Sequence, residues 1–84
     1  MFAKIKSPVF IDSLHFEVSA PAPAHLKAVL RDDKGSICGT FETKLAKVEN
    51  DVTWRNLNDL PYGVYTMELS RGTDEMKVRL VKRV

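Results

Sequence analysis

The sequence predicts an all-β fold, an immunoglobulin-like antiparallel β-sandwich of about seven strands. Three observations lead to this fold class. Apolar and polar residues alternate along most of the chain, turn signals recur about every eight to twelve residues, and helical spacing competes with alternation in one segment only. With 84 residues, the chain has room for one core, so we expect a single domain, residues 1–84, whose function lies on its surface.

The first strands are separated by a proline-rich connection. A short strand is expected at "AKI" (residues 3–5), and "LHFEV" (residues 14–18) alternates in the manner of a half-buried strand. The segment "APAPA" (residues 20–24) follows. Its prolines cannot donate hydrogen bonds to a sheet, so we interpret it as an extended connection along an edge.

A hairpin is predicted in the middle of the chain. Alternation resumes in "HLKAVLRD" (residues 25–32), and "DDKG" ends at Gly35, a residue suited to a tight turn. The run "SICGTFET" (residues 36–43) then returns antiparallel to the first strand. Its Cys38 is expected to be a small buried side chain rather than a reactive thiol, because nothing nearby marks a nucleophile.

Residues 44–56, "KLAKVENDVTWRN", form the one segment in which a helix competes. We prefer a pair of strands, because Val52 and Trp54 alternate with polar residues in a β-prone run. The turn between the two strands is expected at "END" (residues 49–51).

The last two strands follow a marked corner. Pro61, Tyr62 and Gly63 precede the strand "VYTMELS" (residues 64–70), and the turn "RGTD" leads to the terminal strand "EMKVRLVKRV" (residues 75–84). The inward-facing positions of all these strands define the expected core: Leu14, Phe16, Val18, Leu26, Leu30, Phe41, Trp54, Tyr65, Met67, Val78 and Leu80.

Composition argues against several classes of function. Thirteen basic and eleven acidic residues leave a formal charge of +2, so charge gives no reason to expect a nucleic-acid partner. No window is apolar enough to insert into a membrane. The start of the chain lacks a stretch of signal-peptide length, so we expect no N-terminal export signal in it, which is compatible with a piece of an exported precursor.

Catalytic and metal-binding patterns are also missing from the sequence. His15 and His25 lie on different predicted strands without nearby ligand partners, and no serine lies in a nucleophile-elbow pattern. A single cysteine excludes an internal disulfide and a cysteine-rich zinc site. We therefore expect no catalysis, no metal and no cofactor.

Exposed aromatic residues would support a different class of function. If Trp54 or Tyr62 were exposed to solvent, the domain would be suited to a carbohydrate-binding or adhesion module, because flat rings stack on apolar sugar faces. A single Trp at an alternating strand position is more often part of a core. A purely structural module of a larger surface protein remains the third alternative.

The order of several motifs resembles one protein family. "SP" at residues 7–8 precedes a strand, Asp32 and Gly35 flank the hairpin, Leu60, Gly63 and Tyr65 form a Leu-x-x-Gly-x-Tyr corner, and the closing strand carries lysines among aliphatic residues. Over about the whole chain, this order resembles the C-terminal sorting domain of the type IX secretion system, found on exported proteins of the Bacteroidetes.

The resemblance implies a function in export. Such a domain directs a passenger protein through the secretion machinery to the cell surface, and a sorting peptidase removes it. The machinery and the peptidase would be protein partners, and an edge-strand dimer is a further expectation. The implied recognition residues lie in the last strand: Lys77, Val78, Arg79, Leu80, Val81 and Lys82. The implied structural corner consists of Leu60, Gly63 and Tyr65.

Overall fold

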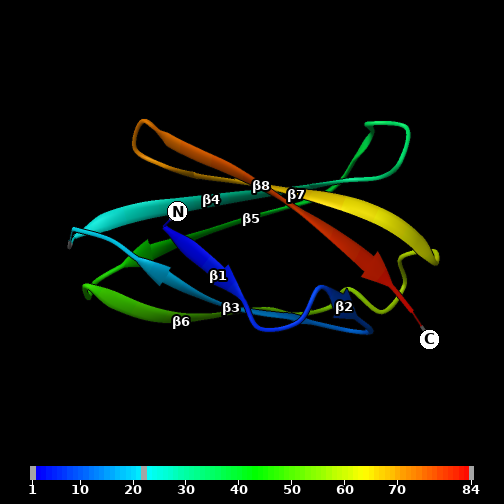
Figure 1. Cartoon of the computed structure of the whole chain (residues 1–84), viewed down its shortest axis with the longest axis horizontal. Helices are drawn as coiled ribbons and strands as arrows, with labels where there is room; N and C mark the ends of the chain where they lie inside the picture. Colours follow the sequence, from blue (N-terminus) through cyan, green and yellow to red (C-terminus); the bar gives the residue numbers. More distant parts are fainter. Residues whose placement is uncertain (1, 22, 84) are drawn as a thin grey trace.

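A computed structural model, which describes residues 2–21 and 23–83, confirms the all-β fold class. Two sheets pack as a sandwich of eight strands rather than about seven (Figure 1). The strands are β1 (Ala3–Ile5), β2 (Val9–Phe10), β3 (Leu14–Ser19), β4 (Ala24–Arg31), β5 (Ile37–Leu45), β6 (Glu49–Trp54), β7 (Gly63–Arg71) and β8 (Asp74–Lys82). The described residues contain no helix, and hence none long and apolar enough to span a membrane.

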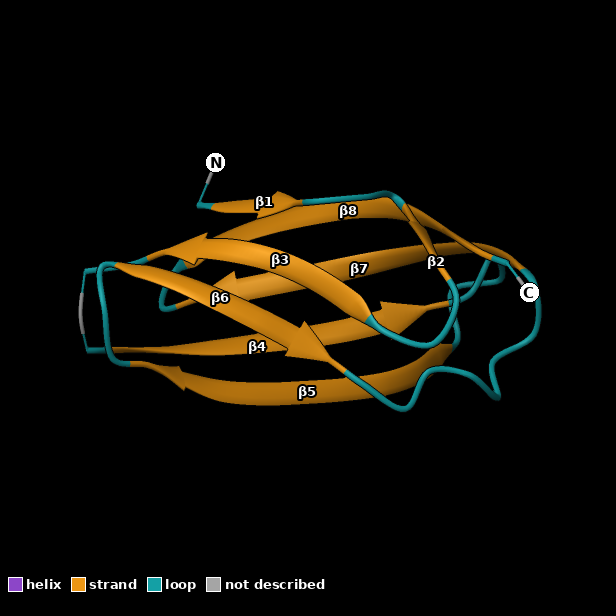
Figure 2. Ribbon diagram, turned by 90° about the horizontal axis from the view of Figure 1, so that it is seen from below, coloured by secondary structure: helices purple, strands orange, loops and turns teal. Residues whose placement is uncertain are grey.

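The smaller sheet has the order β1-β3-β6 and the larger sheet the order β2-β8-β7-β4-β5. All neighbouring strands are antiparallel except β2 and β8, which run parallel and place Val9 opposite Val81. Figure 1 shows the two sheets as separate layers, and Figure 2 looks onto them with the smaller sheet in front of the larger one. Strand β2 is a two-residue element in which the chain crosses from the smaller sheet to the larger one. Of the pair of strands expected within residues 44–56, only the second is a separate strand, because Lys44 and Leu45 end β5 and β6 belongs to the other sheet.

The core lies between the two sheets and follows the alternation of the sequence. In β3 the side chains of Leu14, Phe16 and Val18 are buried, while His15 and Glu17 are exposed. Of the residues expected in the core, only Phe41 and Val78 are half-buried, and both pack against it. The core also contains buried side chains outside that expected list: Ala3, Phe10, Ala20, Ala28, Leu45, Val52, Leu57 and Leu69.

The turn expected at residues 49–51 is wrong, because those residues begin β6. The chain turns instead over residues 46–48. Asn50 explains the shift: its Oδ1 accepts a hydrogen bond from the Lys47 N–H, and its Nδ2 donates to the Lys47 carbonyl at 2.8 Å. A turn-forming residue therefore closes the preceding turn from a position within the strand.

Candidate functional site: the β8 edge and the corner

The predicted recognition strand, β8, lies near one edge of the larger sheet. Its inner neighbour is β7, along its whole length. Its outer neighbour, β2, pairs only with Val81 and Lys82. Among the described residues no strand therefore pairs with the outer side of residues 74–80, whereas β2 covers the end of the strand.

The hydrogen bonds to β2 reveal which backbone groups of β8 face the free side. The Val81 N–H donates to the Pro8 carbonyl at 2.8 Å, and the Arg83 N–H donates to the Phe10 carbonyl at 2.9 Å. Backbone N–H groups alternate between the two sides of a strand. The N–H groups of Lys77 and Arg79 therefore point toward the uncovered side of β8, where no described strand pairs with them.

The six predicted recognition residues do not share one face. Lys77, Arg79 and Val81 are exposed on the outer face of the sheet. Val78 is half-buried, and the side chains of Leu80 and Lys82 are buried. A partner that approaches the free edge therefore meets outward-facing cations, while the inward side chains anchor the strand in the core.

Lys82 departs from the solvent-facing role expected of a cation on an edge strand. Lys82 is only 3% exposed, and its Nζ donates a hydrogen bond to the Arg83 carbonyl at 3.0 Å. The same nitrogen lies 6.0 Å from the centre of the Tyr62 ring. The aliphatic stem thus packs in the interior while the charge contacts a carbonyl and an aromatic face at the end of the sandwich.

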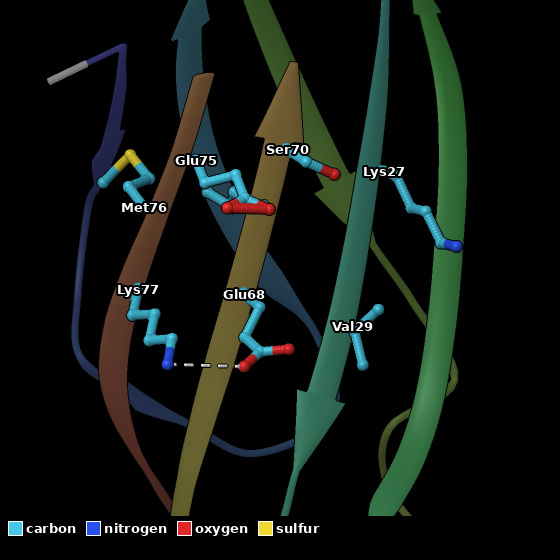
Figure 3. Close-up of a pocket in the computed structure, with 8 residues that line it drawn as sticks. Lys27, Val29, Glu68, Ser70, Glu75, Met76 and Lys77 are labelled. Carbon is cyan, nitrogen blue, oxygen red and sulfur yellow. Dashed lines mark ion pairs between the residues drawn. The ribbon is translucent and has the colours of Figure 1, made fainter. Parts of the chain in front are cut away.

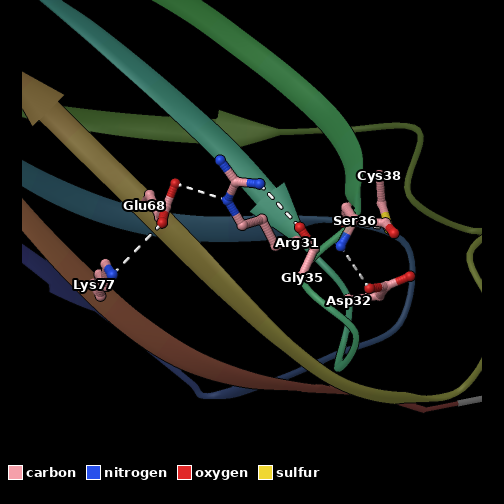
Figure 4. Close-up of polar contacts among 7 residues, drawn as sticks. All are labelled: Arg31, Asp32, Gly35, Ser36, Cys38, Glu68 and Lys77. Carbon is pink, nitrogen blue, oxygen red and sulfur yellow. Dashed lines mark hydrogen bonds and ion pairs between the residues drawn. The ribbon is translucent and has the colours of Figure 1, made fainter.

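A row of charged side chains links β8 to the β4–β5 hairpin (Figure 4). Glu68 of β7 contacts Lys77 Nζ at 3.7 Å and accepts a hydrogen bond from Arg31 Nε at 3.0 Å. Arg31 also donates to the Gly35 carbonyl at 2.9 Å. The hydrogen bond from Arg31, aided by the nearby positive charges, lowers the pKa of Glu68.

The same row borders a shallow groove of about 370 Å³ on the outer face of the larger sheet. Figure 3 shows Lys77 and Glu68 reaching toward each other on one side of it, with Lys27 and Val29 on the other. The groove is lined by charged, polar and apolar side chains alike, including Glu75 and Met76. It lies next to the free stretch of β8, so a segment added to that edge would have this surface beside it.

The predicted corner forms a compact hydrogen-bonded unit. The Tyr65 hydroxyl donates to the Pro61 carbonyl at 2.7 Å, which ties the incoming strand to the loop before it. Gly63 has a φ of +146°, a conformation that favours glycine. Leu60 packs against the core, and the Phe10 ring meets Tyr65 edge-on at 6.0 Å. The corner thus joins the start of β7 to the short strand that covers the end of β8.

A cavity of about 260 Å³ lies between this corner and the β4–β5 hairpin and is lined by Cys38, Tyr62 and Tyr65, among others. Cys38 is half-buried, and its thiol lies 3.6 Å from the Ser36 carbonyl. Burial, with a contribution from the negative charge of Asp32, raises the pKa of the Cys38 thiol. A raised pKa keeps the thiol protonated near neutrality, which makes it a poor nucleophile.

The aromatic residues do not form an extended platform. Trp54 is buried and stacks on Phe41 at a centroid distance of 5.5 Å, and Phe16 and Tyr65 are buried as well. Tyr62, at 66% exposed, is the one large aromatic side chain of the described residues that is open to solvent.

The two histidines lie on the outer faces of different sheets. His15 contacts Ser13 and Thr53, and His25 contacts Glu42 at 3.4 Å. Within residues 2–21 and 23–83, no three His, Cys, Asp or Glu side chains come together in a group that could hold a metal ion.

Sequence reasoning missed two parts of this site. It did not identify β2 as the cover of β8, although the apolar pair Val9 and Phe10 directly after Pro8 was a signal for a short strand. It also missed Glu68, whose outward position in an alternating strand indicated a cross-strand charge partner. The sequence matches no family model, and no curated protein is significantly similar to it.

Proposed function

We propose that this chain is a non-catalytic protein-binding domain, and specifically a C-terminal sorting domain that directs a passenger protein through the type IX secretion system to the cell surface. The observation that carries the proposal is the free stretch of β8. Between Asp74 and Leu80 no described strand pairs with its outer side, toward which the N–H groups of Lys77 and Arg79 point. Such an edge is suited to the addition of a strand from a receptor.

The surroundings of β8 support this role. The strand is held by its buried side chains, by β2 at its end and by the Glu68 contact to Lys77. A receptor strand would therefore find the edge already ordered, which lowers the entropic cost of binding. The cations of β8 discourage pairing with unspecific strands, since an added chain must accommodate Lys77 and Arg79. In this proposal the partners are the secretion machinery and a sorting peptidase, and the protein passes the periplasm on its way to the surface.

An export assay tests the proposal. The chain is fused behind a periplasmic reporter in a host that has the type IX machinery and in the same host without it. We expect the reporter on the surface or in the medium only when the machinery is present, and we expect deletion of residues 82–84 to abolish export, because Lys82 pairs with both Phe10 and Gly63. Undiminished export of the truncated fusion would contradict the role of β8. Failure of the intact fusion would favour a structural module.

One observation, the exposure of Tyr62, favours a second candidate function, carbohydrate binding or adhesion. Tyr62 presents its ring to solvent, as such a module requires. Trp54 is buried, so we expect its fluorescence to resist quenching by acrylamide. A module of this class would lose binding to surface polysaccharides when Tyr62 is changed to Ala, whereas the sorting function would persist in Tyr62→Ala.

A further inference from the structure

The opposite edge of the larger sheet is formed by β5, and its outer side has no partner strand among the described residues. With nine residues, β5 is the longest uncovered edge: β1 has three residues, β6 has six, and β8 is covered at its end. It contains no proline, and β-branched or aromatic residues recur along it. Such an edge is a template for pairing with another strand.

The two most exposed aliphatic side chains of the described residues flank this edge. Ile37, at the start of β5, is 57% exposed, and Val48, just past its end, is 65% exposed. In an antiparallel pair of two β5 strands, the start of one strand lies beside the end of the other. In a pair centred near the end of β5, Ile37 of one copy would lie beyond the paired residues, beside the turn at residues 46–48 of the second copy, which contains Val48.

The charges on β5 select one register for that pair. Glu42 and Lys44 lie two residues apart on the outer face, and Thr43 between them faces the inner side. Pairing Thr43 with its own equivalent places Glu42 of each copy opposite Lys44 of the other. Shifting the centre to Glu42 or to Lys44 would instead place like charges opposite each other, which is unfavourable.

The inner face agrees with the same register. It places the two Thr43 side chains together at the two-fold axis, and it sets the half-buried Phe41 opposite Leu45, which is already buried in the core of its own chain. The Thr–Thr pair is the contact that this face adds, and such pairs are favourable across antiparallel strands. Lys44 belongs to no ion pair among the described residues, so its charge is free to meet a second copy. The other edges fit less well, since β6 carries Glu49 and Asp51 with no cation.

We propose that a second copy of this chain docks on the β5 edge, so that two larger sheets continue into each other through an antiparallel β5–β5 pair centred on Thr43. This site goes beyond the proposed sorting function, because it uses the edge opposite β8 and leaves residues 74–80 free. The dimer presents the two β8 edges at the far ends of one continuous sheet.

Charge reversal of the purified 84-residue chain tests the interface. Glu42→Lys gives each copy two cations and Lys44→Glu gives each copy two anions, so either substitution turns both cross-strand contacts repulsive. We expect each variant alone to dimerise at least about tenfold more weakly than the original chain. The two variants mixed together have complementary charges and should associate, as should the double variant E42K/K44E.

Sedimentation equilibrium from micromolar to millimolar concentrations measures these affinities, and circular dichroism checks that each variant is folded. Recovery of dimer in the mixture requires folded variants, so it separates loss of charge pairing from loss of fold. A chain that stays monomeric over the whole range would overturn the proposal. A dimer that both single variants leave unchanged would also overturn it, since its interface would lie elsewhere. Neither result would affect the export assay, which depends on β8.

Discussion

The two edges of the larger sheet are built differently. Among the described residues no strand pairs with the outer side of β5, although its last residue, Leu45, is buried, and its outward charges, Glu42 and Lys44, are opposite in sign and two residues apart. The β8 edge is closed at its end by β2 and continues as a free stretch that carries Lys77 and Arg79. The first edge is complementary to itself, whereas the second is positioned by its surroundings and keeps Lys77 and Arg79 facing outward. One small sheet can therefore offer two edges for different partners.

The largest expected effect follows from loosening β2, which covers the end of β8, because the two edges of the larger sheet then become alike. Phe10 is 3% exposed and holds β2 in place by packing into the core. We expect Phe10→Ala to lower the free energy of unfolding by about 3–5 kcal/mol, because it leaves a cavity beside Tyr65. Chemical denaturation measures this loss. Hydrogen exchange should show the amides of Val81 and Arg83 becoming unprotected, so that β8 resembles the open β5 edge.

Val9→Ala is the matched control for that substitution. Val9 lies next to Phe10 in the same short strand, but its side chain faces solvent. Its truncation should change the free energy of unfolding by less than about 0.5 kcal/mol. Equal losses for the two variants would contradict the view that β2 is held by its inward side chain.

A smaller effect concerns the corner that leads into β7 and thereby positions β8. Tyr65→Phe removes the hydroxyl that donates to the Pro61 carbonyl and leaves the buried ring in place. We expect a loss of about 1–2 kcal/mol in the free energy of unfolding, since one hydrogen bond to a partly buried carbonyl is lost. Unchanged stability in thermal or chemical denaturation would show that the corner does not depend on this bond.

The smallest effect concerns the charged row that links β8 to the β4–β5 hairpin through Glu68. Its pKa is lowered in the folded protein, first by the hydrogen bond from Arg31, so the ionised form stabilises the fold. This contribution is present above the pKa of the unfolded chain and is lost as the pH falls through the folded pKa. We expect Glu68→Gln to flatten this acidic part of the stability curve. A curve that keeps its acid slope in the variant would assign that slope to other carboxylates.

Alternation along the chain was sufficient to predict the sheets, because one face of each long strand is buried. It correctly placed Leu14, Phe16 and Val18 inside, and likewise the apolar face of β7. It could not predict β2, since two residues are too few to show a period. Length and alternation also carry no information about which strand lies at which edge.

The site was predicted less well than the fold, for reasons that lie in single residues. Lys82 was predicted as a recognition residue, yet it is buried, because the fold offers its charge a carbonyl and a ring at the end of the core. Asn50 indicated a turn correctly, but the turn was placed three residues too late, because the Asn50 side chain reaches back to Lys47. Both errors come from side-chain hydrogen bonds, which the alternation of apolar and polar residues does not reveal.

The central claim is that the backbone edge of β8 is what a partner recognises. Arg79 allows a direct test, because its N–H points to the free side and its side chain faces outward. Proline is tolerated on an edge where its missing N–H would have faced solvent, so Arg79→Pro removes the outward donor without breaking a bond to β7. Arg79→Ala removes the same side chain and keeps the donor.

Export of a reporter fused to each variant, in a host with the type IX machinery, measures the difference, and thermal unfolding of the isolated domains confirms that both are folded. The account predicts that Arg79→Ala supports export close to that of the original chain and that Arg79→Pro abolishes it. Equal export of two folded variants would show that the edge of β8 is not the element that the machinery recognises.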